Sequence, residues 1–159
     1  MSNNKVTNIL FCGIGGQGIL TAAEICCLAA MFDGFHVKKS EVHGMAQRGG
    51  SVESHVRFGT KVYSPLIGRG EADILLSTDE TERESYLDYL NENSIDLIES
   101  LKKGREKTEN VFYLNTFMLG ALAKRLKIKE ESWQKALKKV LPAKTLAENT
   151  DIFFLGYQT

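Results

Sequence analysis

The sequence Gly13-Ile14-Gly15-Gly16-Gln17-Gly18 stands between two apolar segments, Val6–Cys12 before it and Ile19–Met31 after it. A continuous apolar run that stops at glycine is typical of a strand buried on both faces, and the longer segment has the composition of a mostly buried helix. A short second strand is predicted at Phe35–Lys38. This order of strand, glycine turn, helix and strand predicts a parallel pair of strands in a right-handed βαβ unit.

The sequence beyond this unit also alternates between strand and helix patterns. Val52–Phe58 alternates apolar and polar residues, and together with Val62–Ile67 it predicts a β-hairpin. Further strands are predicted at Ala72–Ser77 and Asn110–Asn115, and helices at 79–90, 117–126, 131–141 and 145–154. These elements predict an α/β fold: one Rossmann-like, three-layer domain over residues 1–159, with a largely parallel sheet and an added β-hairpin.

The composition excludes several classes of function. Lys+Arg and Asp+Glu balance at 20 each, so no overall field would attract nucleic acid or an anionic membrane. No apolar stretch has the form of a signal peptide or a membrane helix, so a cytoplasmic location is expected. The three cysteines form no CxxC pair and are expected to be buried thiols. His36, His43 and His55 match no metal-binding spacing, so no metal site is expected.

The glycine turn, residues 13–18, has the strand-to-helix context in which such turns bind phosphate. Glycine permits a positive φ and lets backbone N–H groups approach a ligand closely. A dinucleotide site also needs an acidic residue about 20 positions later, but Lys38 and Lys39 stand there and Glu41 comes late. Three interpretations stay open: a crossover or contact surface without a ligand, a site for a phosphate-bearing ligand, and a nicotinamide site.

A second dense motif is the polar segment, residues 40–50, which reads Ser-Glu-Val-His-Gly-Met-Ala-Gln-Arg-Gly-Gly and is predicted to be a loop. Glutamate, histidine, glutamine and arginine together with three glycines are unusual for a simple connection. The candidate binding residues are therefore Gly13, Gly15, Gly16, Gln17 and Gly18 in the turn, and Ser40, Glu41, His43, Gly44, Gln47, Arg48, Gly49 and Gly50 in the polar segment. No catalytic residue is assigned.

Three ordered motifs carry a family resemblance: Gly13–Leu20, Ser40–Gly50 and the sequence Tyr63-Ser64-Pro65-Leu66-Ile67. Together they resemble the gamma-type subunit of the 2-oxoacid:ferredoxin oxidoreductases, the pyruvate and ketoisovalerate family, and are most similar to its indolepyruvate branch. The resemblance covers residues 6–90 and resumes more loosely over Asn115–Leu122.

The resemblance implies a subunit without independent activity. The complex would convert a 2-oxoacid, with an aryl pyruvate preferred, and coenzyme A to an acyl-CoA and carbon dioxide, with electrons passing to ferredoxin. Thiamine diphosphate and iron–sulfur clusters would lie on partner subunits, and this chain would help to form the coenzyme A region. Arg48, Lys38 and Lys39 would then bind phosphate, and His43 and Gln47 would donate hydrogen bonds to a partner. The isolated chain is expected to form a homodimer. The alternatives are a free-standing Rossmann-type nucleotide-binding oxidoreductase and a protein-contact module.

One segment departs from the family pattern. A buried strand is expected after Asn93, but Ser94–Leu101 reads as a helix. Either the chain has a real deletion, or residues are absent between Asn93 and Ser94. The second interpretation is favoured, because the loss of a central strand would disturb the sheet. An intact mass near 17.7 kDa would instead establish that nothing is missing.

Overall fold

The computed structural model describes residues 5–16, 18–43 and 50–159. Its centre is a five-stranded sheet in the order β2-β3-β1-β4-β5. The strands are β1 (Thr7–Ile14), β2 (His36–His43), β3 (Ser51–Gly59), β4 (Ile74–Ser77) and β5 (Ile95–Asp96). β1 pairs with β4, and β4 with β5, in parallel, whereas β3 is antiparallel to both of its neighbours. Four of the five strands therefore run in one direction, as the sequence predicts for a largely parallel α/β sheet.

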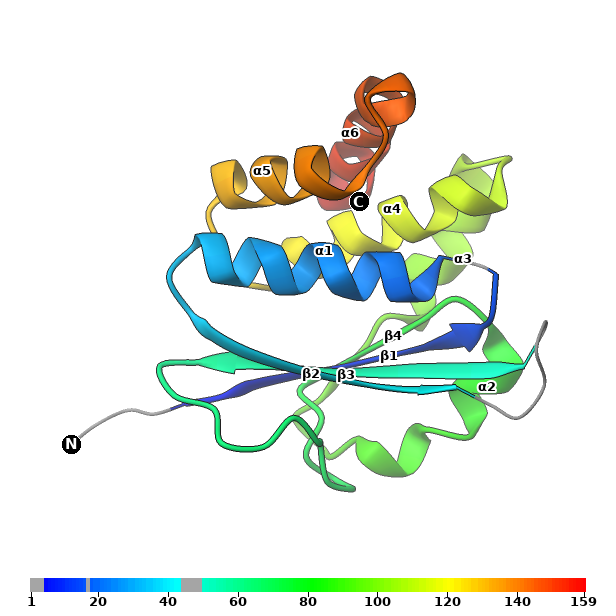
Figure 1. Ribbon diagram of the computed structural model, residues 1–159. Coiled ribbons are helices and arrows are strands. Elements are labelled where there is room, and N and C mark those ends of the chain that lie inside the picture. The colour runs from blue at the N-terminus through cyan, green and yellow to red at the C-terminus, as the bar shows by residue number, and fades with distance from the viewer. Residues whose placement is uncertain (1–4, 17, 44–49) are drawn as a thin grey trace.

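Most of the helices cover one face of the sheet (Figure 1). α1 (Ile19–Phe32) lies directly on the strands, and α5 (Glu130–Val140) packs on α1. Beside them α4 (Val111–Ala123) packs against α6 (Ala143–Gln158), and α3 (Ile98–Lys107) packs on α4. The main hydrophobic core lies between this layer and the sheet, with Ile9, Phe11, Val56 and Leu76 from the strands fully or almost fully buried.

The opposite face of the sheet has a thinner cover. α2 (Glu80–Glu84), a 3₁₀ turn at Leu87–Tyr89 and the segment 60–73 lie below the strands in Figure 1. A smaller core there contains Leu10, Cys12, Ile67, Leu75 and Tyr86. The Asp79 carboxylate accepts a hydrogen bond from the Glu82 backbone N–H at 2.9 Å, which confirms the N-cap expected at the start of α2.

The predicted hairpin is wrong in its second strand. Residues 62–67 form no strand, and the hairpin of this sheet consists of β2 and β3. The backbone N–H of Val62 donates to His36 Nδ1 at 2.9 Å, and that of Ile67 to His55 Nδ1 at 3.0 Å. These N–H groups are therefore bound by side chains rather than by a neighbouring strand. β3 also lies between β1 and β2, so these two strands run in the same direction without pairing.

Two other predicted boundaries are also wrong. Residues 40–43 belong to β2, so the predicted loop at 40–50 begins later, and residues 44–49 lie outside the described part of the chain. The predicted strand Asn110–Asn115 is the start of α4. The Asn110 side chain accepts a hydrogen bond from the Phe112 backbone N–H at 2.9 Å and so caps that helix. α4 is apolar on all sides because α1, α3 and α6 surround it.

A two-residue strand follows Asn93, but it is not the buried strand that the family pattern predicts there. β5 contains only Ile95 and Asp96 and pairs with β4 at the edge of the sheet. Asn91 and Ser94 form a turn before it, in which the Ser94 hydroxyl accepts from the Asn91 N–H at 2.8 Å and donates to the Ala72 carbonyl at 2.6 Å. A gap between Asn93 and Ser94 stays a prediction, which the intact mass tests.

The contact between α4 and α6 is unusually close. A Cβ atom on Gly120 would lie 1.9 Å from the Phe153 carbonyl oxygen, and one on Gly156 would lie 2.0 Å from the Phe117 carbonyl oxygen. Neither helix has room for a side chain at the crossing, so backbone meets backbone. This crossing fixes where α6 lies on the helical layer.

The three cysteines are buried, as the sequence predicts. Burial, with the added negative charges of Glu82 and Glu53, raises the pKa of the Cys12 thiol to about 12. Burial likewise raises the pKa of Cys27 to about 12 and that of Cys26 well above its usual value. All three are protonated thiols at neutral pH and are poor nucleophiles.

Candidate functional site

The glycine turn leaves the end of β1 directly beside the end of the polar segment. The Gly15 backbone N–H donates a hydrogen bond to the Gly50 carbonyl oxygen at 2.8 Å, which continues the pairing of β1 with β3 by one more residue. Gly13, within β1, pairs with Val52 of β3. The two motifs therefore meet through Gly15 and Gly50, which are 35 positions apart in the sequence.

Two glycines of the turn have backbone conformations that favour glycine. Gly16 has φ of 92°, and Gly18, the N-cap residue of α1, has φ of 80°. Gly18 is also close to α4, because a Cβ atom on it would lie 2.5 Å from Asn115 Nδ2. The turn therefore leads into α1 through a residue that must lack a side chain. Gln17 lies outside the described residues.

We expect Gly18→Ala to lower the free energy of unfolding by roughly 1–2 kcal/mol for the left-handed backbone, with a further cost for displacing the Asn115 amide. Gly16→Ala is the matched control, since its φ is also positive but no atom lies within 4 Å of its Cβ position. Urea midpoints of the two variants measure the difference. Equal losses would contradict a specific Gly18–Asn115 contact.

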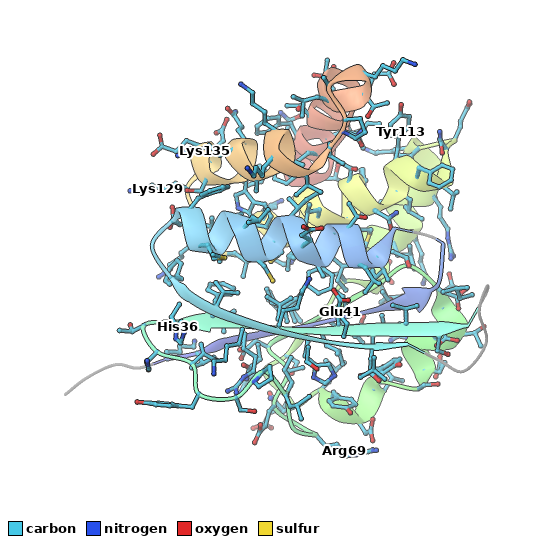
Figure 2. The ribbon with its side chains drawn as sticks, viewed as in Figure 1. His36, Glu41, Arg69, Tyr113, Lys129 and Lys135 are labelled. Carbon is cyan, nitrogen blue, oxygen red and sulfur yellow. The ribbon has the colours of Figure 1, made fainter. Side chains whose placement is uncertain are left out.

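The structure does not bring all of the polar segment to the turn. Ser40 and Glu41 lie within β2, level with His55 and Ser54 of β3, and His43 ends that strand opposite Val52. The Glu41 carboxylate forms an ion pair with Lys39 Nζ at 2.8 Å. Figure 2 shows Glu41 between the sheet and α1. Gly44, Gln47, Arg48 and Gly49 lie outside the described residues.

Lys38 and Lys39, the expected phosphate ligands, are engaged elsewhere. Lys38, on the edge strand β2, lies opposite Arg57 of β3, and its Nζ donates to the Tyr63 carbonyl oxygen at 3.2 Å. The neighbouring Arg57 donates to the Ser64 carbonyl oxygen at 2.7 Å. These two cations hold the third sequence motif, residues 63–67, over the face of the sheet opposite α1. That the two lysines bind phosphate stays a prediction.

A histidine and a glutamate form a pair on that same face of the sheet. His55 Nδ1 accepts the Ile67 N–H, so its Nε2 carries the proton that is donated to the Glu53 carboxylate at 2.7 Å. The ring of Tyr89 contacts His55 edge-on at a centroid distance of 5.9 Å. These contacts fix the 60–73 segment on the sheet, and His55 is almost fully buried. Their role is structural positioning.

A pocket of about 340 Å³ lies on the helical side of the turn. We call it the helical pocket, and α1, α4 and α6 form its walls. Gly18 and Thr21 line it from α1, Thr116 and Leu119 from α4, and Asn149 from α6. Its remaining lining residues are Ala22, Ile25, Asn110, Phe112, Tyr113, Asn115, Leu141 and Thr145. Gly18 is thus shared by the turn and the pocket.

The described residues contain no group of three His, Cys, Asp or Glu side chains placed to hold a metal ion. Within the same residues, no helix is both long and apolar enough to cross a membrane. The site offers backbone donors at the start of α1 and a pocket lined with hydroxyl, amide and apolar groups.

A model of the family described as pyruvate ferredoxin/flavodoxin oxidoreductase matches this chain over residues 8–114 and 102–159. The chain belongs to this family. Over 156 aligned residues it is 30% identical to the common subunit gamma of the pyruvate/ketoisovalerate oxidoreductases of Pyrococcus abyssi, covering 82% of this chain and 84% of that subunit. The resemblance drawn from the three sequence motifs is confirmed.

A second group of relatives is more similar over a shorter stretch. The chain is 46% identical over 91 residues to the indolepyruvate oxidoreductase subunit IorB of Thermococcus kodakarensis, which covers 57% of this chain and 45% of that subunit. The IorB subunit of Archaeoglobus fulgidus is 46% identical over 95 residues. The chain therefore spans about half the length of these relatives.

Solved structures of the oxidoreductase family share the fold. The gamma subunit of a keto/oxoacid ferredoxin oxidoreductase from Geobacter sulfurreducens superposes with a TM-score of 0.76 at 23% identity, covering 96% of each chain. The 2-oxoglutarate:ferredoxin oxidoreductase of Magnetococcus marinus, solved with 2-oxoglutarate, coenzyme A and succinyl-CoA, gives 0.79 at 19% identity over 97% of this chain and 31% of that one. At these identities the comparison establishes the architecture alone.

The sequence alone does not predict the helical pocket. A strand at Asn110–Asn115, as the sequence predicts, does not bring Thr116 to Asn149, whereas α4 does. One local pattern favours a helix instead: Asn110, a good N-cap residue, precedes a mostly apolar segment of 13 residues, which is longer than a typical strand.

Proposed function

We propose that this chain is the gamma-type subunit of a 2-oxoacid:ferredoxin oxidoreductase that acts on an aryl pyruvate such as indolepyruvate. The reaction would join coenzyme A to the acyl group, release carbon dioxide and pass electrons to ferredoxin. Thiamine diphosphate and the iron–sulfur clusters would belong to partner subunits. The preference for an aryl substrate rests on the 46% identity to IorB proteins.

The observation that best supports the proposal is the hydrogen bond from the Gly15 N–H to the Gly50 carbonyl oxygen at 2.8 Å. It places the glycine turn beside the end of the polar segment, the two motifs on which the family resemblance depends. Backbone donors at the start of α1 favour a phosphate group there. Arg48, two residues before Gly50, could add a bidentate, charge-assisted hydrogen bond to the same group.

The proposed subunit role predicts a partner. Purification from the native source should yield this chain with a larger protein that contains thiamine diphosphate and iron. A free-standing nucleotide-binding oxidoreductase would instead carry its cofactor on the lone chain, and a protein-contact module would carry none. The isolated chain is expected to form a homodimer, which sedimentation velocity tests.

The role of Arg48 is tested in the assembled complex. We expect Arg48→Ala to raise the apparent KM for coenzyme A about tenfold or more, because a hydrogen bond to a charged group is lost. Arg69→Ala is the matched control: Arg69 is exposed, pairs with Asp88 and lies far below the sheet in Figure 2. If Arg48→Ala leaves both complex formation and the KM for coenzyme A unchanged, the assignment of Arg48 is wrong.

A further inference from the structure

The helical pocket has no charged side chain in its lining. Ala22, Ile25, Leu119 and Leu141 supply apolar surface, and the polar groups are hydroxyls and amides. The Glu148 carboxylate accepts a hydrogen bond from the hydroxyl of Tyr113, a lining residue, and so joins α6 to α4. A phosphate entering on that side would meet a negative charge. The part of a ligand that occupies this pocket is therefore uncharged.

The polar floor of the pocket has one acceptor and one donor still available. The Thr116 hydroxyl donates to Asn149 Oδ1 at 2.7 Å, and Asn149 Nδ2 donates one of its two protons to the Thr145 carbonyl oxygen at 3.0 Å. The Thr116 oxygen can still accept a hydrogen bond, and Asn149 Nδ2 can donate its second proton. An adenine edge offers the complement, an amino donor beside a ring-nitrogen acceptor, whereas the corresponding guanine edge offers two acceptors.

The rim of the pocket carries an exposed aromatic ring. Phe112 lines the pocket and is 65% exposed, although it stands at the start of a helix whose later residues are buried. An exposed ring beside a pocket is a stacking surface for a planar base. Stacking alone accepts any base, so hydrogen bonds to the edge of the base must select among them. Figure 2 shows the neighbouring Tyr113 at the α4–α6 side of the same region.

Size and position decide how much of a ligand enters. At about 340 Å³ the pocket is at the lower end of ligand sites, enough for a base and part of its sugar but not for a whole dinucleotide or coenzyme A. Gly18, the N-cap of α1, is one of its lining residues. A nucleotide with its base in the pocket would therefore extend its phosphates toward the glycine turn.

We propose that the helical pocket is an adenine-binding site, in which Phe112 stacks on the base and Thr116 and Asn149 read its edge. This inference rests on the proposed function for the placement of the ligand's phosphates at the glycine turn. The base site itself is lined by residues of α1, α4 and α6, their caps, and Leu141 at the end of α5. It differs from a Rossmann dinucleotide site, where an acidic residue after the second strand holds the ribose.

Adenosine, guanosine and pantetheine are the probes, titrated by calorimetry into the full chain. Adenosine is expected to bind, guanosine to bind about tenfold more weakly because its edge leaves a hydrogen bond unmade, and pantetheine not to bind at this site. Phe112→Ala should weaken adenosine about tenfold through lost stacking. Tyr63→Ala is the matched control, since it removes an aromatic ring that is 77% exposed on the other side of the sheet, and it should leave adenosine affinity unchanged.

Three results would overturn the adenine site: no adenosine binding at millimolar concentration, equal affinity for guanosine, or equal effects of Phe112→Ala and Tyr63→Ala. The experiments distinguish failure of the adenine site from failure of the subunit assignment. If adenosine does not bind while Arg48→Ala still raises the KM for coenzyme A, the adenine site is wrong and the subunit assignment stands. If adenosine binds with the stated preference but the chain has no thiamine-containing partner, the subunit assignment is wrong and the adenine site stands.

Discussion

Gly120→Ala is expected to destabilise the protein by roughly 3 kcal/mol, the upper part of the usual range for overpacking. The added Cβ would lie 1.9 Å from the Phe153 carbonyl oxygen and 2.8 Å from the Tyr157 backbone nitrogen. Both atoms belong to the backbone of α6, so no side-chain rotation relieves the contact and the two helices must separate. Without that contact, alanine would stabilise α4 by about 1 kcal/mol relative to glycine.

Gly104→Ala in α3 is the control for this result. Its Cβ would approach Leu114 Cδ1 at 2.7 Å and Phe117 Cδ1 at 2.8 Å, which are side-chain atoms rather than backbone. Both variants gain the same helix propensity, so the difference between their urea midpoints isolates the backbone contact of α4 with α6. A loss at Gly120 no greater than that at Gly104 would mean that the two helices can move apart at little cost.

Trp133→Ala is expected to have a similar or larger effect, about 3–5 kcal/mol. Trp133 is 1% exposed, packs against Phe153 at a ring-centroid distance of 5.5 Å, and fixes α5 within the main core. Since natural domains are stable by about 5–15 kcal/mol, this loss would leave a protein at the low end with at most about 2 kcal/mol of stability. Circular dichroism in urea measures it, because the chain's one tryptophan is the residue removed.

Trp133→Phe distinguishes lost volume from lost polarity. The indole Nε1 has no hydrogen-bond partner among the described residues, so phenylalanine removes no hydrogen bond there. Its cost should be well below that of alanine and reflect only the smaller ring. If phenylalanine costs as much as alanine, the indole N–H contributes an interaction that the packing does not explain.

The sequence best predicts the structural elements that are determined by residues close together in the chain. The apolar run before the glycines, the turn, α1, α5 and the Asp79 cap are each encoded within a few residues, and their ends differ from the structure by only one or two positions. The buried cysteines follow from the same local pattern. The family assignment also follows from short motifs, because each motif is a contiguous stretch of the chain.

The order of the strands and the helical pocket depend instead on contacts between distant residues. Nothing in the alternation of Val52–Phe58 specifies that β3 inserts between β1 and β2. Val62 and Ile67 are buried like strand residues, but histidine rings bind their N–H groups. Thr116 and Asn149 are 33 positions apart and meet only because Gly120 and Gly156 let α4 and α6 touch. Such pairs become visible only in three dimensions.

The position of β1 has a consequence for synthesis on the ribosome. β1 is the innermost strand of the sheet, and its two neighbours, β3 and β4, begin only at Ser51 and Ile74. At translation rates of about 5–20 residues per second, the apolar β1 and α1 leave the exit tunnel seconds before either neighbour is available. Because collapse of such a segment takes on the order of microseconds, the nascent chain must be shielded during this interval. The first fifty residues are therefore where this protein should depend most on chaperones.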